Sequence, residues 1–454
     1  MRFSGFEQML SHWASATPDA PAIKYERGGS LLCLSYSEFL EKIHARAAQL
    51  RGGGKTCLAV LCDGSLDCVV TVFASVLAGM QTVLLDESIP DESLGALLRY
   101  TDADQVFSSD ASLCGALAPY LTRGVSGGAG RLLFFTSGTT DSSKAVILTD
   151  KSLCASAWNG AQMLPLRPED TLLCMLPLAH VFGFVCGLLW GLSCGACVAL
   201  GRGARHYVDD CAFFRPTAVS LVPMLLGFLL RQSLLNAELG LILVGAGDCP
   251  PALIEAAAAR GLRVSFGYGL SETSSGVAIS VSGDPYAMQV CPDDRITLAE
   301  DGEILIEAPT CVMQGYYKRP EDTAAVLSGG VVHTGDLGRF DENGLLHITG
   351  RKKEILVLSD GTKLFLPEYE ASLSAALKTA ELATALLDGR PVLIVTADAP
   401  DDGELWRLLR PVMDTLPRGK QIQKIIRLSH PLPRTATGKL KRWQLQTEVE
   451  HEQS

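Results

Sequence analysis

The stretch LLFFTSGTTDSSKAVILT, from Leu132 to Thr149, places a polar segment between two apolar runs. Leu132–Phe135 and Ala145–Leu148 are apolar and partly aromatic or β-branched, which predicts two short strands that bound a loop. The loop offers hydroxyl groups, backbone N–H groups and the ammonium of Lys144, which together suit an anion with many oxygens. Polyphosphate is the ligand we infer first, although a loop of this kind taken alone fits a Ser/Thr-rich hairpin turn better.

The composition of the chain is that of an ordinary globular protein. Its 454 residues are 47% hydrophobic and 20% charged, and a chain of this length is expected to form two or three domains. The net charge of −11 argues against nucleic acid as the main partner. Fourteen cysteines without a pairing rhythm, and an N-terminus without an apolar signal core, predict free thiols in a cytoplasmic protein. Cys194 and Cys197 lack the second ligand pair of a zinc site.

The segment Leu176–Gly201 is apolar and long enough to suggest a membrane span. Glycines recur in it at every fourth residue, as on a close-packed transmembrane face: Gly183, Gly187, Gly191 and Gly195. The segment also contains Pro177 and His180, and the same glycine stripe would let a buried helix lie tightly on a sheet. We therefore expect a buried segment and no transmembrane span.

Strand and helix patterns alternate from about Thr56 to Tyr268. The expected strands are Cys57–Cys62, Thr82–Leu85, Ala218–Val222, Leu241–Val244 and Val264–Tyr268, with helical stretches between them. This alternation predicts an α/β fold with a largely parallel sheet and helices on both faces. Because ligands bind beyond the carboxyl ends of such strands, the opening loop, Gly245–Gly247 and the turn after Tyr268 should converge on one place.

From about Asp301 the pattern changes to β-hairpins. Asp301-Gly302 and Asn343-Gly344 are strong turn dipeptides between short strands. After Gly350 the chain mixes short strands with two helices, which predicts a separate small α+β domain. Between Trp406 and Arg442 there are ten Lys or Arg residues and a single acidic one, a pattern that fits a solvated basic face or an anion-binding surface equally well.

Two common catalytic motifs do not match. The usual nucleotide loop has Gly before its Lys, Ser or Thr after it, and a helix next, whereas Ser143 and Ala145 flank Lys144 and a strand follows. In GLSET (Gly269–Thr273), Thr273 stands where a hydrolase nucleophile elbow has its closing Gly.

Six motifs follow one another along the chain: FTSGTTDSSKAV, LPLAHVFG, GYGLSET, HTGDLG, GRKKEILVLSDGTKLFLPEYE and PRTATGKLKR. In this order they closely resemble the adenylate-forming superfamily, which holds acyl-CoA synthetases, peptide-synthetase adenylation domains and luciferases. The resemblance covers the chain from about Phe6 to Arg442. The segment GRKKEILVLSDG is most similar to the long-chain fatty acyl-CoA ligase branch.

This resemblance implies an α/β N-terminal domain with a β-hairpin-rich subdomain over residues 1–350, and a small mobile α+β domain over residues 351–454. It implies an AMP-forming acid–thiol ligase that activates a fatty acid with ATP and Mg²⁺, releases pyrophosphate and passes the acyl group to CoA. Transfer to an acyl carrier protein is one alternative. A non-catalytic acyl or adenylate sensor is another, although a sensor could lack Lys439, Glu272 or Asp336, which are all present.

The resemblance also assigns nucleotide-binding residues. Those that would hold the β- and γ-phosphates are Thr136, Ser137, Gly138, Thr139, Thr140 and Lys144. Those around adenine and the α-phosphate are Gly245, Ala246, Gly247, Tyr268, Gly269 and Ser271. Tyr268 would stack on adenine, and the glycine turn would let the ring lie against backbone. Asp336 would bind both ribose hydroxyls, and Arg351 would contact the ribose as well.

Three residues take catalytic roles in this resemblance. Glu272 would be the magnesium-linked carboxylate, and His180 would lie near the reacting acid. Lys439 would bridge the acid and the phosphate during adenylation, because the meeting of two anions needs cations around the α-phosphate. Lys353 falls at the hinge about which the small domain would turn between the two half-reactions. The basic tail would then close over polyphosphate and meet CoA phosphates or an acidic carrier.

The chain departs from the family pattern in places. Asp141, Ser143 and Ala145 replace the usual Gly, Pro and second Gly of the opening loop. An extra carboxylate beside a triphosphate could weaken binding by about 1 kcal/mol. Asp150 stands where His is frequent, and Lys363 where Asn is frequent.

Overall fold

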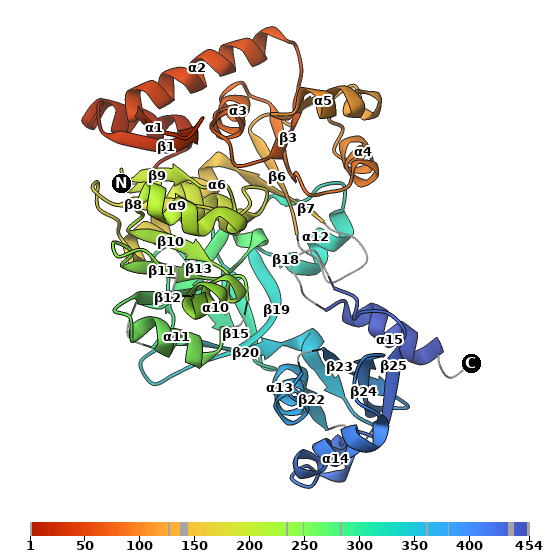
Figure 1. Ribbon diagram of the computed structural model, residues 1–454. Coiled ribbons are helices and arrows are strands. Elements are labelled where there is room, and N and C mark those ends of the chain that lie inside the picture. The colour runs from red at the N-terminus through yellow and green to blue at the C-terminus, as the bar shows by residue number, and fades with distance from the viewer. Residues whose placement is uncertain are drawn as a thin grey trace.

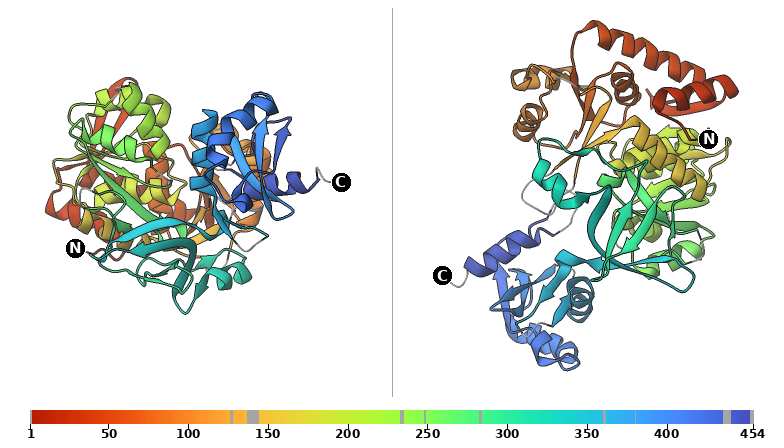
Figure 2. Two further views of the ribbon diagram at one scale, coloured as in Figure 1. Left: turned by 90° about the horizontal axis from the view of Figure 1, so that it is seen from below. Right: turned by 180° about the vertical axis from the view of Figure 1, so that it is seen from behind.

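The computed structural model describes residues 2–125, 128–136, 144–232, 235–247, 249–281, 284–359, 362–379, 381–434 and 440–451. Figure 1 shows a large body built from the first three quarters of the chain and a smaller one, drawn in blue, that ends at the C-terminus. The same two bodies are visible from below and from behind in Figure 2.

The opening loop belongs to a sheet of six strands in the order β17-β7-β6-β4-β3-β5. These strands are β3 (Cys57–Cys62), β4 (Gln81–Asp86), β5 (Gln105–Phe107), β6 (Arg131–Phe135), β7 (Ala145–Thr149) and β17 (Gly315–Tyr316). The helices around the sheet are α1 (Phe6–Ala16), α2 (Tyr36–Gly52), α3 (Leu66–Leu77), α4 (Asp91–Tyr100) and α5 (Ala111–Leu117). β3 to β6 run parallel, and β3 is buried along its whole length, as expected of a strand covered on both faces.

A second sheet has nine strands in the order β14-β13-β12-β11-β10-β8-β9-β1-β2. Its strands are β1 (Pro21–Arg27), β2 (Ser30–Ser35), β8 (Thr171–Cys174), β9 (Cys197–Leu200), β10 (Ala218–Leu221), β11 (Leu241–Val244), β12 (Arg263–Leu270), β13 (Ser275–Ile279) and β14 (Gln289–Val290). The connecting helices are α6 (Asp150–Met163), α7 (Val181–Phe184), α8 (Trp190–Ser193), α9 (Tyr207–Phe214), α10 (Pro223–Gln232) and α11 (Pro251–Ala258). The parallel run β9-β8-β10-β11-β12 forms its centre.

A third sheet is built from hairpins: β15 (Arg295–Leu298), β16 (Glu303–Glu307), β18 (Leu327–Ser328), β19 (Val331–Phe340) and β20 (Leu346–Arg351), with α12 (Pro320–Val326) beside it. The smaller body contains β21 (Ile355–Val357), β22 (Lys363–Phe365), β23 (Leu382–Leu387), β24 (Arg390–Thr396) and β25 (Lys424–Leu428). Its helices are α13 (Leu366–Leu377), α14 (Asp402–Met413) and α15 (Arg442–His451). Because β20 still pairs with β19 at Arg351, the hairpin sheet runs to that residue; the domain division after residue 350 stays a prediction.

The predicted α/β fold class is confirmed, and the strands expected on both sides of the opening loop are present as β6 and β7. The strands from Thr56 to Tyr268 do not share a single parallel sheet. They are divided between the six-stranded and the nine-stranded sheet. Strands buried on both faces have the same continuous apolar pattern, so the sequence does not reveal which of them are neighbours.

The apolar segment Leu176–Gly201 is buried between sheet and helix. It forms α7, a π-helical turn (Val185–Leu189), α8 and β9, and among the described residues no helix is long and apolar enough to cross a membrane. At Gly191 the expected role of the glycine stripe is confirmed. A Cβ at Gly191 would lie 2.7 Å from Val198, so only glycine lets the helix approach β9 this closely. All fourteen cysteines of the chain are free.

Candidate active site

The base of the opening loop is closed by two residues that face each other across the β6–β7 hairpin. Thr136 N–H donates to the Lys144 carbonyl at 2.9 Å, and Lys144 N–H donates to Thr136 Oγ1 at 3.1 Å. Both predicted ends of the loop are therefore placed. The predicted phosphate-binding residues Ser137, Gly138, Thr139 and Thr140, together with Asp141 and Ser143, lie outside the described residues.

The Lys144 side chain points to α12. Its Nζ lies 2.7 Å from Asp322 Oδ1 and 4.8 Å from the centre of the Tyr316 ring. The Tyr316 hydroxyl donates to Glu272 Oε1, so the predicted phosphate-binding lysine and the predicted magnesium carboxylate flank one tyrosine. Burial and the Glu272 carboxylate raise the pKa of Tyr316, and the hydrogen bond from Lys144 lowers the pKa of Asp322. We call Lys144, Tyr316, Glu272 and Asp322 the Lys144 cluster.

A second group of predicted residues meets at Asp336. Its carboxylate accepts the Tyr268 hydroxyl at 2.9 Å and lies 2.8 Å from Arg351 Nε. Asp336 is 2% exposed, and burial together with its charge raises the pKa of Tyr268. The structure thus brings together three residues that the resemblance placed around one nucleoside; we call Tyr268, Asp336 and Arg351 the Asp336 cluster.

The two clusters are joined by β12 and the turn that follows it. Tyr268 lies within β12, and Ser271 and Glu272 lie in the single 3₁₀ turn Ser271–Thr273 directly after the strand. Gly269 between them has no room for a side chain, because a Cβ there would lie 1.8 Å from the Ser275 carbonyl oxygen. One short segment therefore fixes the spacing between the two clusters.

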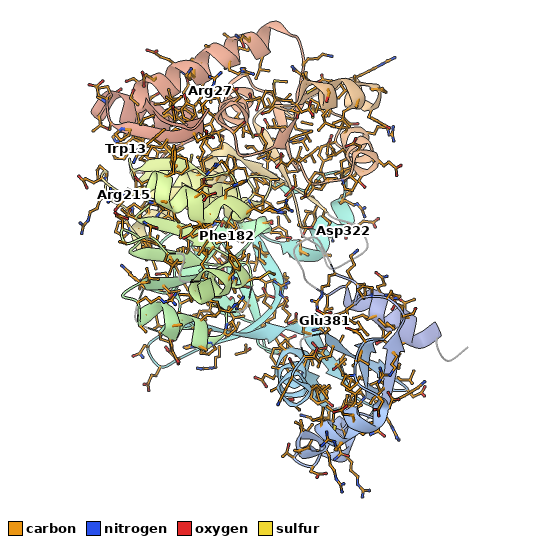
Figure 3. All side chains as sticks on the ribbon, viewed as in Figure 1. Trp13, Arg27, Phe182, Arg215, Asp322 and Glu381 are labelled. Carbon is orange, nitrogen blue, oxygen red and sulfur yellow. The ribbon has the colours of Figure 1, made fainter. Side chains whose placement is uncertain are left out.

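The glycine turn after β11 packs against the helix that His180 precedes. A Cβ at Gly245 would lie 2.9 Å from the Phe182 ring, and Ala246 adopts a left-handed backbone with φ of 62°. Gly247 completes the turn, two residues after Gly245. A Cβ at Gly247 would lie 3.6 Å from the Pro223 ring, which is an ordinary contact distance. Figure 3 labels Phe182 within the large body.

His180 directly precedes α7, and its side chain faces the end of β4 without capping the helix. Its Nε2 lies 3.9 Å from Asp86 Oδ2. Burial lowers the pKa of His180, and the Asp86 charge opposes this shift. A neutral imidazole is therefore favoured at this position, and a neutral ring can accept or donate a hydrogen bond to a nearby carboxyl group.

The predicted hinge lies in a short 3₁₀ turn, Lys352–Glu354, directly after β20. The preceding side chain, Lys352, is bound to the hairpin sheet: its Nζ lies 2.6 Å from Asp301 and 2.7 Å from Glu303. The chain is thus anchored one residue before Lys353, whose role as the pivot stays a prediction.

The basic tail is partly neutralised within the smaller body. Arg442 forms two hydrogen bonds to Glu370 at 2.9 and 2.8 Å, and Arg434 lies 3.3 Å from Glu381. Arg407 and Arg410 on α14 are largely exposed, at 73% and 82%. Part of the tail is therefore structural, and these two arginines are exposed beside carboxylates of their own helix, Glu404 at 3.4 Å and Asp414 at 4.0 Å. Lys439 lies outside the described residues.

Two departures from the family pattern have structural surroundings. Asp150 at the start of α6 accepts the Phe6 N–H at 3.2 Å, and burial raises the pKa of its carboxyl. It therefore ties α6 to the beginning of α1. Lys363 is exposed at the start of β22.

Sequence reasoning missed Asp322, Tyr316 and Lys352. Asp322 follows Pro320 and Glu321, a pattern that indicates only a helix start. Tyr316 lies in a strand of two residues, too short to show any period. The Lys-Lys pair of GRKKE could have indicated Lys352, since either lysine fits a contact at the hinge.

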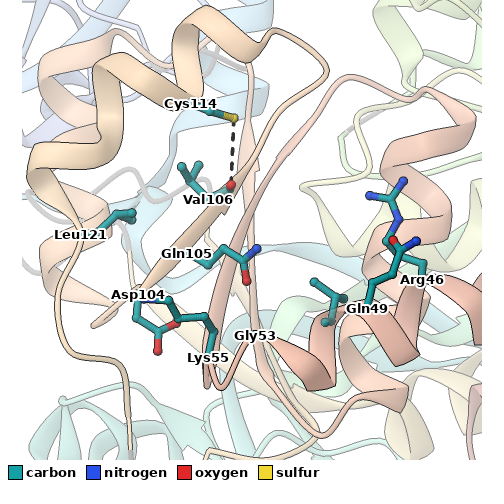
Figure 4. A pocket seen from close by; sticks show the side chains of 10 residues that line it. Arg46, Gln49, Gly53, Lys55, Asp104, Gln105, Val106, Cys114 and Leu121 are labelled. Atoms are coloured by element: carbon teal, nitrogen blue, oxygen red, sulfur yellow. Dashed lines mark hydrogen bonds between the residues drawn. The ribbon is translucent and has the colours of Figure 1, made fainter.

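A cavity of about 560 Å³ lies away from these clusters, between α2, β5 and α5 (Figure 4). Arg46 and Lys55 line it, and Cys114 and Val106 are joined by the hydrogen bond drawn there. No predicted site residue lines this cavity. A much smaller cavity of about 20 Å³ lies along the helix that begins after His180, lined by Val185, Cys186, Trp190, Leu243 and others.

The sequence and the fold of the chain match those of known AMP-binding enzymes. The AMP-binding enzyme family matches residues 10–124 and 130–317. The chain is 27% identical to a 2-succinylbenzoate–CoA ligase of Bacillus cereus, over 97% of this chain and 98% of that protein. It is 31% identical to an indoleacetate–CoA ligase of Aromatoleum aromaticum, over 68% of this chain and 66% of that protein.

Solved structures show the same fold. O-succinylbenzoate coenzyme A synthetase (MenE) from Bacillus subtilis, in complex with AMP, superposes with a TM-score of 0.82 at 24% identity, covering 96% of this chain and 97% of that chain. ATP-bound MatB from Rhodopseudomonas palustris gives a TM-score of 0.81 at 21% identity, covering 98% and 99%.

The chain belongs to the AMP-binding enzyme family, and it is an AMP-forming acid–thiol ligase. The predicted family and enzyme class are confirmed, and the predicted cofactors ATP, Mg²⁺ and CoA agree with these relatives. A B. subtilis MenE structure contains ATP and a magnesium ion, and the ligases above are named for CoA.

Proposed function

We propose that this enzyme joins a compact carboxylic acid with an aromatic ring to CoA. In the first step an acid oxygen bonds to the α-phosphorus of ATP, and the bond to the bridging oxygen breaks to release pyrophosphate. In the second step the CoA sulfur bonds to the acyl carbon, the bond to AMP breaks, and the thiol proton passes to solvent. The observation that carries the proposal is that one segment, Tyr268–Glu272, joins the Asp336 cluster to the Lys144 cluster.

The Asp336 cluster suits the nucleoside end of ATP. A buried carboxylate held by a hydroxyl and a guanidinium is preorganised to accept hydrogen bonds from two neighbouring ribose hydroxyls. In our proposal Asp336 accepts these hydrogen bonds, Arg351 donates to a ribose oxygen, and the Tyr268 ring contacts the base. In our proposal adenine lies against the backbone of the turn Gly245–Gly247, where glycine adds no side chain between the ring and the peptide groups.

The Lys144 cluster suits the phosphates. Glu272 is the carboxylate that would hold magnesium, which shields phosphate charge when it is bound. Among the described residues no three His, Cys, Asp or Glu side chains are grouped to hold a metal by themselves. A single carboxylate still fits magnesium, because this ion commonly takes its other ligands from substrate phosphates and water. Lys144 would bind the outer phosphates, and Lys439 would supply the cation of the adenylation step.

A compact aromatic acid is supported by the named relatives. They are ligases of 2-succinylbenzoate and indoleacetate, which does not support the expectation of a fatty acid. The cavity beyond His180, with room for about one water molecule, does not distinguish between the two classes of acid.

CoA is favoured over a carrier protein as acceptor. The named relatives are CoA ligases, and no finding here points to an acyl carrier protein or to a sensor without catalysis. Arg407 and Arg410 are exposed and form ion pairs with Glu404 and Asp414, which an acceptor that carries phosphates would have to displace. Their participation in binding CoA is part of this proposal.

The test is a pyrophosphate-release panel run with and without CoA. The acids are benzoate, phenylacetate, indoleacetate, 2-succinylbenzoate, octanoate and palmitate, and mass spectrometry identifies any acyl-CoA. With an aromatic acid, we expect the enzyme to release about one pyrophosphate per active site without CoA and to release it continuously when CoA is present. Faster turnover of octanoate or palmitate would refute the acid class. Adenylation without acyl-CoA would refute the acceptor, and pantetheine in place of CoA shows how much the nucleotide part of CoA contributes.

A further inference from the structure

The ion pair between Lys144 and Asp322 joins two segments far apart in the sequence. Lys144 closes the opening loop, and Asp322 lies in the first turn of α12 (Figure 3). The two side chains are 25% and 33% exposed, so the pair is partly shielded from water. A second cation, Arg319, lies 3.5 Å from the other Asp322 oxygen. In this arrangement the lysine that is predicted to hold the phosphates already has an anionic partner.

The backbone fixes this contact. β17 pairs with β7, so that Tyr316 lies opposite Val146, and the Tyr317 N–H donates to the Ala145 carbonyl at 2.8 Å. The Tyr316 N–H donates to Thr323 Oγ1 at 2.9 Å, which ties the start of α12 to the same strand. The pairing of β17 with β7 and the hydrogen bond from β17 to α12 therefore fix the position of Asp322 relative to Lys144.

We propose that Asp322 is a positioning residue that holds Lys144 beside the Tyr316 ring before nucleotide binds, and that it competes with the triphosphate for this lysine. This inference rests on the proposed nucleotide function of the site. Because AMP has no β- or γ-phosphate, Asp322 selectively weakens the binding of ATP and leaves that of AMP alone. Release of pyrophosphate then returns Lys144 to Asp322.

The competition has a charge argument. An ammonium drawn to the phosphates leaves Asp322 as an extra anion near a polyanion, which opposes binding. Arg319 remains beside Asp322 when Lys144 moves to the phosphates, so the Asp322 carboxylate still has a cationic partner. A partly exposed pair of this kind is worth about a two- to fivefold change in a dissociation constant.

The experiment measures equilibrium binding of two nucleotides by calorimetry. Magnesium with α,β-methylene-ATP, which cannot be adenylated, is compared with AMP. Asp322→Asn removes the charge and keeps the shape, Asp322→Glu restores the charge, and Glu321→Gln removes the neighbouring exposed carboxylate on the same helix as a matched control. We expect Asp322→Asn to bind the ATP analogue about two- to fivefold more tightly than the unmodified enzyme, while its AMP affinity stays within about twofold. Asp322→Glu should resemble the unmodified enzyme.

A double-mutant cycle locates the effect on Lys144. In a Lys144→Ala background, Asp322→Asn should raise the affinity for the ATP analogue by less than about twofold, because the lysine for which Asp322 and the phosphates compete is absent. The inference is overturned if Asp322→Asn leaves the analogue affinity unchanged or weakens it, if AMP responds equally, or if Glu321→Gln has the same effect. If the unmodified enzyme binds neither nucleotide, the proposed function itself fails, which distinguishes the two failures.

Discussion

The Asp336 cluster and the Lys144 cluster hold their charges in different ways. In the Asp336 cluster the central carboxylate is 2% exposed and is contacted by a hydroxyl at 2.9 Å and a guanidinium at 2.8 Å. In the Lys144 cluster the central ammonium is 25% exposed and is bound to a carboxylate on a different element. The Asp336 carboxylate is thus buried among its partners, whereas the Lys144 ammonium is partly exposed and can exchange its partner.

This difference suits the two ends of a nucleotide. A nucleoside presents neutral hydroxyl groups that a rigid, buried acceptor can recognise without rearrangement. A triphosphate arrives with several charges and leaves in pieces, so a cation that can change partners is more useful than one fixed in place. We infer that affinity for the nucleoside is built into the fold and that affinity for the phosphates is adjustable.

The largest effect should come from a residue outside both clusters. In our proposal Lys439 supplies a cation for adenylation alone, so we expect Lys439→Ala to slow adenylation by about 10²–10³-fold. Thiol transfer from supplied acyl-adenylate should survive much better, because the proposal gives this lysine no part in the second step. Single-turnover assays of each half-reaction measure both. Equal loss of the two steps contradicts the assignment.

The next largest effect sharpens the comparison at its rigid end. Asp336→Ala removes a buried acceptor and strands the Tyr268 hydroxyl and Arg351, so we expect about a hundredfold weaker binding of AMP. The ATP analogue should weaken by the same factor, since both nucleotides share the ribose. Calorimetry with both ligands gives the two numbers.

A matched control for this variant is available on the same hairpin. Asp341 lies at the β19–β20 turn and accepts the Leu345 N–H at 2.9 Å, so Asp341→Ala disturbs the hairpin without touching the Asp336 cluster. Its nucleotide affinities should stay within about threefold of the unmodified enzyme. If Asp341→Ala weakens AMP as much as Asp336→Ala does, the hairpin fold and not the carboxylate explains the loss.

A smaller effect tests the adjustable end. Lys144→Ala removes one charged hydrogen-bond donor that is partly exposed, so we expect the ATP KM to rise about ten- to twentyfold. AMP binding and the KM for the acid should change little. Lys151→Ala, an exposed lysine at the start of α6, serves as the matched control. A parallel loss of AMP affinity would show that Lys144 acts on the fold of the site as a whole.

Local patterns in the sequence predicted the strands but not their neighbours. β6 and β7 were foreseen because each is a short apolar run that ends at a polar loop. The split into two sheets was not, because β4 and β10 have equally apolar patterns and only long-range pairing decides the sheet to which each belongs. The fold class depends on the alternation of elements, which is why the sequence predicts it while the pairing of the strands stays open.

The candidate site was predictable only where a motif carries its residues. Tyr268 and Asp336 lie in motifs, and the structure brings them within hydrogen-bond distance. Asp322 lies 178 residues from its partner Lys144, and their contact depends on the two-residue strand β17, which shows no pattern in the sequence. Contacts made by such short pairings are set by tertiary structure and escape local reasoning.

The smallest effect returns to the loop between Thr136 and Lys144. Asp141 replaces a family glycine there and lies outside the described residues, so its expected effect follows from its charge alone. A screened carboxylate near a triphosphate opposes binding by about 1 kcal/mol, or about fivefold. Gly at this position would give both flexibility and neutrality. We therefore expect Asp141→Gly to lower the ATP KM by about fivefold at most and to leave turnover at saturating ATP nearly unchanged.

Steady-state kinetics with varied ATP at fixed acid measures the Asp141→Gly effect, and salt separates it from a change in loop shape. A charge effect should fade as ionic strength rises toward about 0.5 M, because exposed charges are then screened over a few ångströms. Asp141→Asn, which is neutral but keeps a side chain, should reproduce most of the change if charge is the cause. In the double variant of Asp141→Gly and Asp322→Asn, the two changes in the free energy of ATP binding should add if the two carboxylates act on the phosphates independently. If Asp141→Gly abolishes activity, this aspartate is required for the reaction and does not merely oppose phosphate binding. The phosphate end of the site would then depend on fixed contacts, as the nucleoside end does.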